Sequence, residues 1–205
     1  MRPCIASVLF GATLQAAQPA AGQNALTLYG GYRGGGSFEQ VIGATTSSAD
    51  IAGSGAGALS VDWALDAARN IQLFASAQRA SIQVTPASPG APSSVPLNIS
   101  YAHLGGSNFF DGSAGQGGYI AGGLGATVMS PKLDGLGSEI RPSMSIALGY
   151  EYAFSPSLAL RAELRGYATL INSSGALFCS GGCVVVIRGD TLFQADALLG
   201  LSLRF

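Results

Sequence analysis

The sequence predicts an all-β fold, an eight-stranded antiparallel up-and-down transmembrane β-barrel. First, charged residues make up only 10% of the 205 residues, against about 25% in an average soluble domain. Second, the mean hydropathy is positive, yet no run approaches the roughly 20 apolar residues that a membrane-spanning helix needs. Third, eight segments alternate between apolar and polar residues. Strands can span a bilayer only as a closed barrel, because closure pairs every backbone group.

Alternation at every second position indicates a strand with two different faces. The first four expected strands cover residues 24–34, 57–66, 71–84 and the neighbourhood of 97–101. The apolar positions of the first two are Leu26, Leu28, Tyr32, Leu59, Val61, Trp63 and Leu65. The third is ambiguous, since Ile71 and Leu73 favour one face while Phe74 and Ile82 occupy the other.

In the fourth expected strand, Leu97, Ile99 and Tyr101 form an apolar face against Asn98 and Ser100. The fifth, residues 119–128, is rich in glycine. The last three, within 143–154, 158–167 and 193–205, alternate most clearly. Their apolar positions are Met144, Ile146, Leu148, Tyr150, Tyr152, Phe154, Leu158, Leu160, Ala162, Leu164, Phe193, Ala195, Ala197, Leu199, Leu201, Leu203 and Phe205.

The expected connections alternate between long and short. Long ones lie near 35–55, 85–96, 130–141 and 172–189, and short ones near 67–70, 111–117 and 155–157. Long outer loops and short periplasmic turns are typical of bacterial outer-membrane barrels. We therefore expect an integral protein of the cell outer membrane, with both mature termini in the periplasm.

The first segment has the layout of a secretory signal peptide. Arg2 precedes an apolar stretch and then small residues, and Ala20-Ala21-Gly22 is the favoured cleavage site. We expect residues 1–22 to be the signal peptide and residues 23–205 the barrel domain; the alternative is a buried N-terminal helix. Export implies an oxidising compartment.

The two faces of the strands differ in side-chain size. Small residues suit the crowded interior of a narrow barrel, whereas large aliphatic residues and tyrosine suit lipid. Aromatic residues near strand ends are candidates for the interfacial girdles, with ordinary core packing as the alternative. They are Tyr32, Trp63, Phe109, Phe110, Tyr119, Tyr152, Phe154 and Phe205.

Charged residues fall on the expected inward faces. They are Asp62, Glu151, Arg161, Glu163, Arg165, Asp196 and Arg204. Buried charges must be paired, so these residues predict a network that plugs the barrel; the alternative is a polar path for a solute. Directly opposed residues of neighbouring strands point to the same face, so the even-numbered apolar positions of the sixth and seventh strands must lie opposite one another. This places Glu151 opposite Arg161 and Phe154 opposite Leu158, across Ser155-Pro156-Ser157.

The remaining motifs offer little chemistry. Cys179 and Cys183 in "CSGGC" predict a loop disulfide after export, with free thiols or a metal site as weaker alternatives. His103 is the only histidine, and we expect no catalysis, cofactor or metal. A net charge of -1 with Lys132 as the only lysine argues against a nucleic-acid partner.

The whole mature chain resembles the small eight-stranded outer-membrane barrels of the OmpA transmembrane-domain, OmpX and opacity-protein type. The resemblance rests on the signal segment, on "YIAGGLGATV", on "SIALGYEYAFSPSLALRAELRGYATL" and on the terminal strand. It implies that the outer-membrane assembly machinery reads the last strand, where Gly200, Leu203 and Phe205 match the family signal while Leu198 departs from it.

The resemblance also implies neighbours and a role. Outer-membrane lipid and lipopolysaccharide would surround the barrel, and its loops could meet an unknown surface ligand. Barrels of this kind that deacylate lipid A carry His and Ser two positions apart, whereas Ser107 follows His103 by four positions. We expect a structural or surface-interaction role carried by the extracellular loops, with a narrow porin-like channel for small or apolar solutes as the alternative.

Overall fold

The computed structural model describes residues 24–42, 45–83, 93–111, 113–132, 137–171, 177–179, 183–185, 187–188 and 191–205. The expected signal peptide, residues 1–22, lies outside the described residues. Within this part of the chain, no helix is long and apolar enough to cross a membrane.

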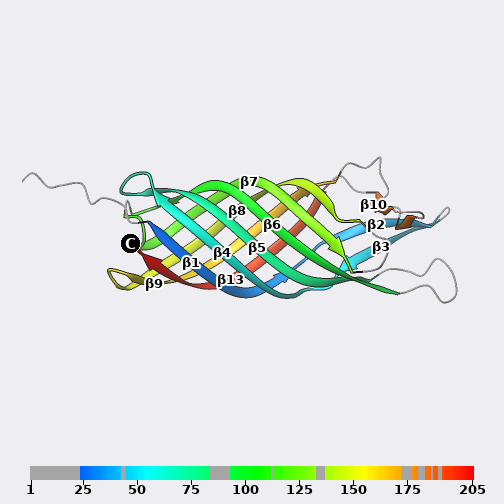
Figure 1. Cartoon of the computed structure of the whole chain (residues 1–205), viewed down its shortest axis with the longest axis horizontal. Coiled ribbons are helices and arrows are strands. Elements are labelled where there is room, and N and C mark those ends of the chain that lie inside the picture. Colours follow the sequence, from blue (N-terminus) through cyan, green and yellow to red (C-terminus); the bar gives the residue numbers. More distant parts are fainter. Residues whose placement is uncertain are drawn as a thin grey trace, which may run out of the picture.

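Eight strands form a closed antiparallel barrel, which confirms the predicted fold class (Figure 1). Each strand pairs with its neighbours, and β13 pairs with β1 from Ala25↔Arg204 to Gly34↔Ala195, which closes the sheet. Closure leaves the barrel itself without an unpaired edge. The eight strands are β1 (Ala25–Gly34), β4 (Ser54–Ala64), β5 (Arg69–Gln83), β6 (Ser94–Phe109), β7 (Gly117–Pro131), β8 (Glu139–Ser155), β9 (Leu158–Leu170) and β13 (Thr191–Arg204).

Short extra strands extend one end of the barrel, which we call the hairpin end (Figure 1). Here β2 (Ser37–Ile42) and β3 (Thr45–Ile51) form a hairpin, and β12 (Ile187–Arg188) pairs with β2. Separately, β10 (Leu177–Cys179) pairs with β11 (Cys183–Val185). Gly35 and Gly36, with φ of 81° and 101°, separate β1 from β2; these left-handed angles favour glycine.

The opposite end, which we call the turn end, carries the turns at 65–68, at 110–111 with 113–116, and at 156–157. Asp66 shapes the first of these by accepting hydrogen bonds from the amides of Ala68 and Arg69 at 2.9 and 2.8 Å. Its ion pair with Arg69, together with those amides, holds the pKa of the Asp66 carboxyl below its usual range. The chain also ends here, since Phe205 and Asn24 exchange backbone hydrogen bonds of 3.0 and 3.1 Å.

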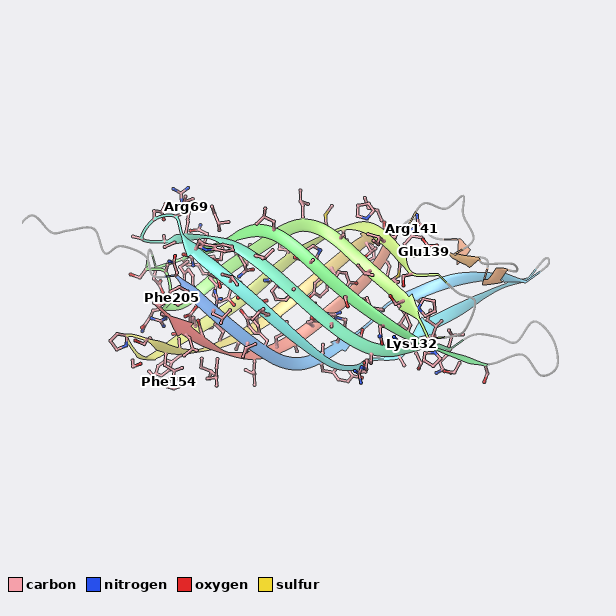
Figure 2. The ribbon with its side chains drawn as sticks, viewed as in Figure 1. Arg69, Lys132, Glu139, Arg141, Phe154 and Phe205 are labelled. Atoms are coloured by element: carbon pink, nitrogen blue, oxygen red, sulfur yellow. The ribbon has the colours of Figure 1, made fainter. Side chains whose placement is uncertain are left out.

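Aliphatic and aromatic side chains cover the outside of the barrel. Leu124 is 68% exposed, for example, and Leu164 is 64% exposed. Six of the expected girdle aromatics are exposed: Tyr32, Trp63, Phe110, Tyr152, Phe154 and Phe205. Figure 2 places Phe154 and Phe205 at the turn end. The other two were wrongly predicted, because Phe109 and Tyr119 are buried inside, where their tilted rings pack with centroids 5.1 Å apart.

The face assigned to the fourth predicted strand was also wrong. Leu97, Ile99 and Tyr101 of β6 point into the barrel and are at most 2% exposed. Phe74 and Ile82 of β5 are buried beside them. The physical reason is that the interior is apolar towards the hairpin end, so the larger side chains of β6 fill the lumen while Asn98 and Ser100 face outward.

The β8–β9 hairpin has the expected register over most of its length. Glu151 lies opposite Arg161 and Tyr152 opposite Leu160. Near the turn, however, a bulge between Ala153 and Ser155 shifts the pairing so that Ser155, not Phe154, lies opposite Leu158. The connection is therefore the two-residue turn 156–157, and the Leu158 amide donates to the Ser155 hydroxyl at 3.1 Å.

Candidate functional site

The inside of the barrel gathers most of the charged side chains singled out from the sequence. Six of them are at most 3% exposed: Asp62, Glu151, Arg161, Glu163, Arg165 and Asp196. Arg204 lies nearer the turn end, with its side chain 10% exposed. The structure adds Arg33 of β1, fully buried, which sequence reasoning missed. The alternation of the first strand could have identified it, because Leu26, Leu28 and Tyr32 are even-numbered and Arg33, at an odd-numbered position, lies on the other face.

Arg161 organises the cluster nearest the turn end. Its Nη1 lies 2.7 Å from Asp62 Oδ2, and its Nε lies 2.9 Å from Glu151 Oε2. Arg204 approaches the other oxygen of Glu151 at 3.3 Å and donates to the carbonyl of Gly115 at 2.6 Å. This cluster links β4, β8, β9 and β13 across the lumen.

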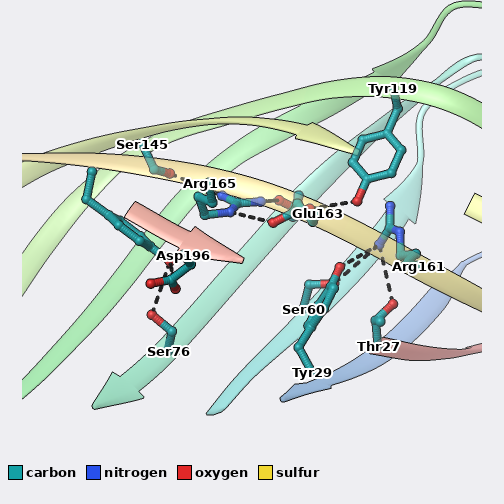
Figure 3. Close-up of polar contacts among 12 residues, drawn as sticks. Thr27, Tyr29, Ser60, Ser76, Tyr119, Ser145, Arg161, Glu163, Arg165 and Asp196 are labelled. Atoms are coloured by element: carbon teal, nitrogen blue, oxygen red, sulfur yellow. Dashed lines mark hydrogen bonds and ion pairs between the residues drawn. The ribbon is translucent and has the colours of Figure 1, made fainter. Parts of the chain in front are cut away.

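A second cluster surrounds Arg165. Its Nε lies 2.7 Å from Glu163 Oε1, and the Tyr119 hydroxyl donates to the other Glu163 oxygen at 2.7 Å (Figure 3). Gln72 joins this cluster to the first, because it accepts from Arg165 at 2.8 Å and donates to Asp62 at 2.8 Å. Arg165 also stacks over the Phe74 ring, 3.8 Å from its centroid.

Arg33 and Asp196 form the third cluster, nearest the hairpin end. Arg33 Nη2 donates to Asp196 Oδ2 at 2.7 Å and to the Ser76 hydroxyl at 2.6 Å. Tyr167 donates to the same Asp196 oxygen at 2.8 Å. The guanidinium lies 4.8 Å from the ring centroids of both Tyr101 and Tyr167, so Arg33 is held by an ion pair and by two cation–π contacts.

These three clusters balance in charge. Four cations (Arg33, Arg161, Arg165 and Arg204) face four carboxylates (Asp62, Glu151, Glu163 and Asp196). Buried charges are stable only when paired and hydrogen-bonded, and each carboxylate here has an arginine within ion-pair distance. These side chains point into the lumen and are almost entirely buried, and the clusters carry no net charge to attract an ion.

Tyrosine rings fill space above glycines of the neighbouring strands. Tyr119 lies opposite Gly149, and Tyr29 lies opposite Gly200. A Cβ added at Gly149 would overlap the Tyr119 ring, and one at Gly200 would come within 2.5 Å of Tyr29 Cδ1. Gly200, expected to be part of an assembly signal, thus also has a packing role. Leu203 and Phe205, the other expected signal residues, point outward and are 55% and 73% exposed.

Towards the hairpin end the interior becomes apolar. Side chains from several strands pack there, each at most 5% exposed: Ile51, Ile82, Leu97, Ile99, Met129, Ile171 and Leu192. We call this group the apolar cap. The lumen therefore has two different parts. Paired charges occupy the part nearer the turn end, and the apolar cap occupies the part nearer the hairpin end.

His103 lies inside the barrel and is 1% exposed. Its Nε2 is 2.9 Å from the Ser143 hydroxyl, and its ring packs near Tyr101 and Tyr167. Ser107 instead hydrogen-bonds Asn70 at 3.4 Å. Within the described part of the chain, no carboxylate hydrogen-bonds His103, and no three His, Cys, Asp or Glu side chains are grouped as metal ligands.

Cys179 and Cys183 lie opposite each other in the small β10–β11 sheet. Their side chains, and therefore the expected disulfide, lie outside what the structure describes.

No family model and no curated protein matches the sequence. Several solved structures do match in shape. Neisserial surface protein A aligns with a TM-score of 0.57 at 11% identity, covering 89% of this chain and 97% of that chain. The outer membrane protein OprG from Pseudomonas aeruginosa aligns at 0.54 and 10% identity, covering 90% and 97%. The outer membrane protein AlkL aligns at 0.55 and 15% identity, covering 100% and 97%. This chain thus shares the fold of small eight-stranded outer-membrane barrels.

Proposed function

We propose that this chain is an integral protein of the outer membrane, with its turn end in the periplasm and its hairpin end outside the cell. The exposed aliphatic belt supports a lipid surrounding, because a soluble protein rarely exposes so large a continuous apolar surface. Short turns at one end and long hairpins at the other support the orientation. Both mature termini are then periplasmic, after removal of residues 1–22 as a signal peptide.

The role we propose is structural or surface-interacting, carried by the segments at the hairpin end, without catalysis. One observation carries this proposal: the lumen is filled by charges that satisfy one another, from Arg204–Glu151 up to Arg33–Asp196. Because no solute passes through a barrel closed in this way, its outer wall and its hairpins are the surfaces that contact other molecules.

We also propose that the assembly machinery of the outer membrane reads β13. Leu201, Leu203 and Phe205 alternate outward up to the end of the strand and are 54%, 55% and 73% exposed. Such a regular apolar face suits recognition before the barrel closes, when the backbone of β13 has not yet paired with β1.

Planar-bilayer recording of the mature protein tests the closed barrel. Folded protein, identified by heat-modifiable gel migration, should produce no steady current. A large and stable open-channel conductance of the wild-type protein would overturn the proposal. A product that stays in the periplasmic soluble fraction would overturn its membrane part.

A second candidate is a narrow path for apolar solutes. The apolar cap favours it, because Leu97, Ile99 and Met129 would solvate an apolar molecule rather than an ion. Electrical recording does not detect such a solute. The rate of uptake of a neutral, apolar fluorescent probe into cells with and without the protein separates this candidate from the first.

A further inference from the structure

The outer wall of the barrel is not uniform. The outward positions of β8, β9 and β13 are apolar or small through most of their length, as shown by Ile146, Leu164 and Phe193, which are 63%, 64% and 67% exposed. The outward positions of β5, β6 and β7 turn polar towards the hairpin end. We call this polar area the β5–β7 patch; it comprises Arg79, Ser81, Asn98, Ser100, Ser130 and Lys132.

Strand register brings these residues together. Arg79 lies opposite Asn98, and Asn98 lies opposite Ser130. Lys132, whose amide donates to the Pro96 carbonyl at 2.9 Å, follows Ser130 by two positions on the same face. Two strand spacings across and two residues along separate the Arg79 and Lys132 Cα atoms by about 12 Å. The two cations thus stand on either side of a row of hydroxyl and amide groups.

The β5–β7 patch lies where the apolar belt should end. Arg79 is eight residues beyond Ile71, which pairs with the girdle residue Trp63. A strand tilted by about 40° rises roughly 2.5 Å per residue along the barrel axis, so Arg79 stands about 20 Å above that girdle. Because the apolar band of such barrels is about 25 Å tall, the guanidinium can reach the level of the outer headgroups. Figure 2 shows Lys132 towards the same, hairpin end.

The two cations of the patch are available to a ligand, whereas the hydroxyls of Ser81 and Ser130 already hydrogen-bond Gln83 and Ser138. Among the described side chains, neither Arg79 nor Lys132 has a carboxylate within ion-pair distance. In the β3–β5 register, Asp50 lies opposite Gln83, four residues beyond Arg79. Beside Arg79 the wall is hollowed: residues of β4, β5 and β6, among them Gly55, Ala77, Asn98 and Ser100, line a depression of about 420 Å³.

We propose that the β5–β7 patch binds the phosphorylated saccharide headgroup of an outer-leaflet glycolipid. Two separated cations match a headgroup that carries phosphates at the two ends of a disaccharide, and the hydroxyl and amide groups between them suit the sugar. The apolar residues below, such as Leu73 and Leu104, 43% and 60% exposed, would contact its acyl chains. This inference rests on the proposed outer-membrane location and adds a specific lipid site to it.

Native mass spectrometry of the folded, mature protein in detergent tests the site. The probes are a bisphosphorylated, six-chain lipid A disaccharide and the same lipid with both phosphates removed. We expect the phosphorylated lipid to bind at least about tenfold more tightly, since hydrogen bonds to charged groups are each strong enough for such a factor. The double variant R79Q/K132Q should lose this preference, and inorganic phosphate should not compete.

The matched control is R69Q, which also removes an exposed arginine from the end of β5 but at the turn end, where its partner is Asp66. It should leave the lipid preference unchanged. Equal binding of the two lipids to wild-type protein would overturn the site, as would an equal loss in R69Q. The failure of this inference can be told apart from the failure of the proposed function. If wild-type protein shows no lipid preference, but it and the double variant keep heat-modifiable migration and pass no steady current, this inference fails and the proposed function stands.

Discussion

The Arg33–Asp196 ion pair is buried where β1 and β13 meet, with both side chains fully shielded from solvent. The alternation of each strand places Asp196 and Arg165 inside the barrel, and it places Arg33 there too. The partner of each charge depends on which strands become neighbours when the barrel closes. Arg33 and Asp196 are 163 residues apart in sequence, and only the closure of β13 on β1 brings them together.

We predict that Asp196→Asn strongly destabilises the barrel. The substitution keeps the shape of the side chain but leaves the Arg33 guanidinium buried, fully inside, without its anion. Breaking a buried pair in this way costs about 3 to 5 kcal/mol in free energy of unfolding. Urea unfolding in lipid vesicles measures it. Glu139→Gln, which removes a partly exposed pair with Arg141, is the control and should cost at most about 1 kcal/mol. Equal losses would contradict the prediction.

We predict that Gly149→Ala is costly although it adds only one methyl group. Its Cβ would overlap the Tyr119 ring, so the ring must move and its hydroxyl would leave Glu163. Overpacking of this kind costs about 1 to 3 kcal/mol. Gly166→Ala on β9 is the matched control, because a Cβ there meets only a carbonyl oxygen at 4.0 Å. The same unfolding assay compares them, and a control that loses as much stability would refute the packing argument.

At the scale of elements, alternation predicted where strands lie better than which way they face. In β8, β9 and β13 the apolar face is the outer one, as expected. In β6 the same pattern has the opposite meaning, because Leu97 and Ile99 belong to the apolar cap. A period of two shows that two faces differ, and only the neighbouring strands decide which one meets lipid. The bulge at 153–155 was likewise invisible, because it depends on the local geometry of the turn.

The orientation of β6 can be tested by two opposite substitutions. Ile99→Asn would place an unpaired amide in a site that is fully buried, at a cost of about 2 to 4 kcal/mol. Ser100→Leu adds apolar surface on the outward face and should change stability by less than about 0.5 kcal/mol. If β6 faced the other way, the order of the two effects would be reversed.

The β10–β11 sheet supports the disulfide expected from the sequence, since directly opposed residues of an antiparallel pair are close enough to be bridged. We predict that Cys179 and Cys183 are bonded in exported protein. Intact mass after alkylation without reduction should show neither thiol modified. Cys179→Ser provides the control, since it should expose one thiol at Cys183 to the reagent. Two modified thiols in the folded, unreduced wild-type protein would exclude the bond.

At the scale of the whole molecule, the composition predicted a transmembrane barrel, and the pairing of β13 with β1 closes that barrel. Few charges and no long apolar run require a closed sheet in lipid, and those few charges then need partners inside. The sequence could not reveal that the interior is divided along its axis, because each strand contributes only a few inward residues to each part. The division appears only when the strands are assembled, with Arg33 and Asp196 just below the apolar cap.

This division predicts that the barrel is closed twice, in series. Three alanines at Ile99, Met129 and Leu192 would empty much of the apolar cap but leave the paired charges. Three alanines at Asp62, Glu151 and Arg161 would remove the cluster at the turn end but leave the two other charge clusters and the cap. Because current through two barriers in series is limited by the narrower one, each variant should stay silent in planar bilayers, provided that heat-modifiable migration shows it folded. A steady current through the first variant would mean that the charges do not seal the lumen. A steady current through the second would mean that neither the cap nor the remaining charge clusters seal it.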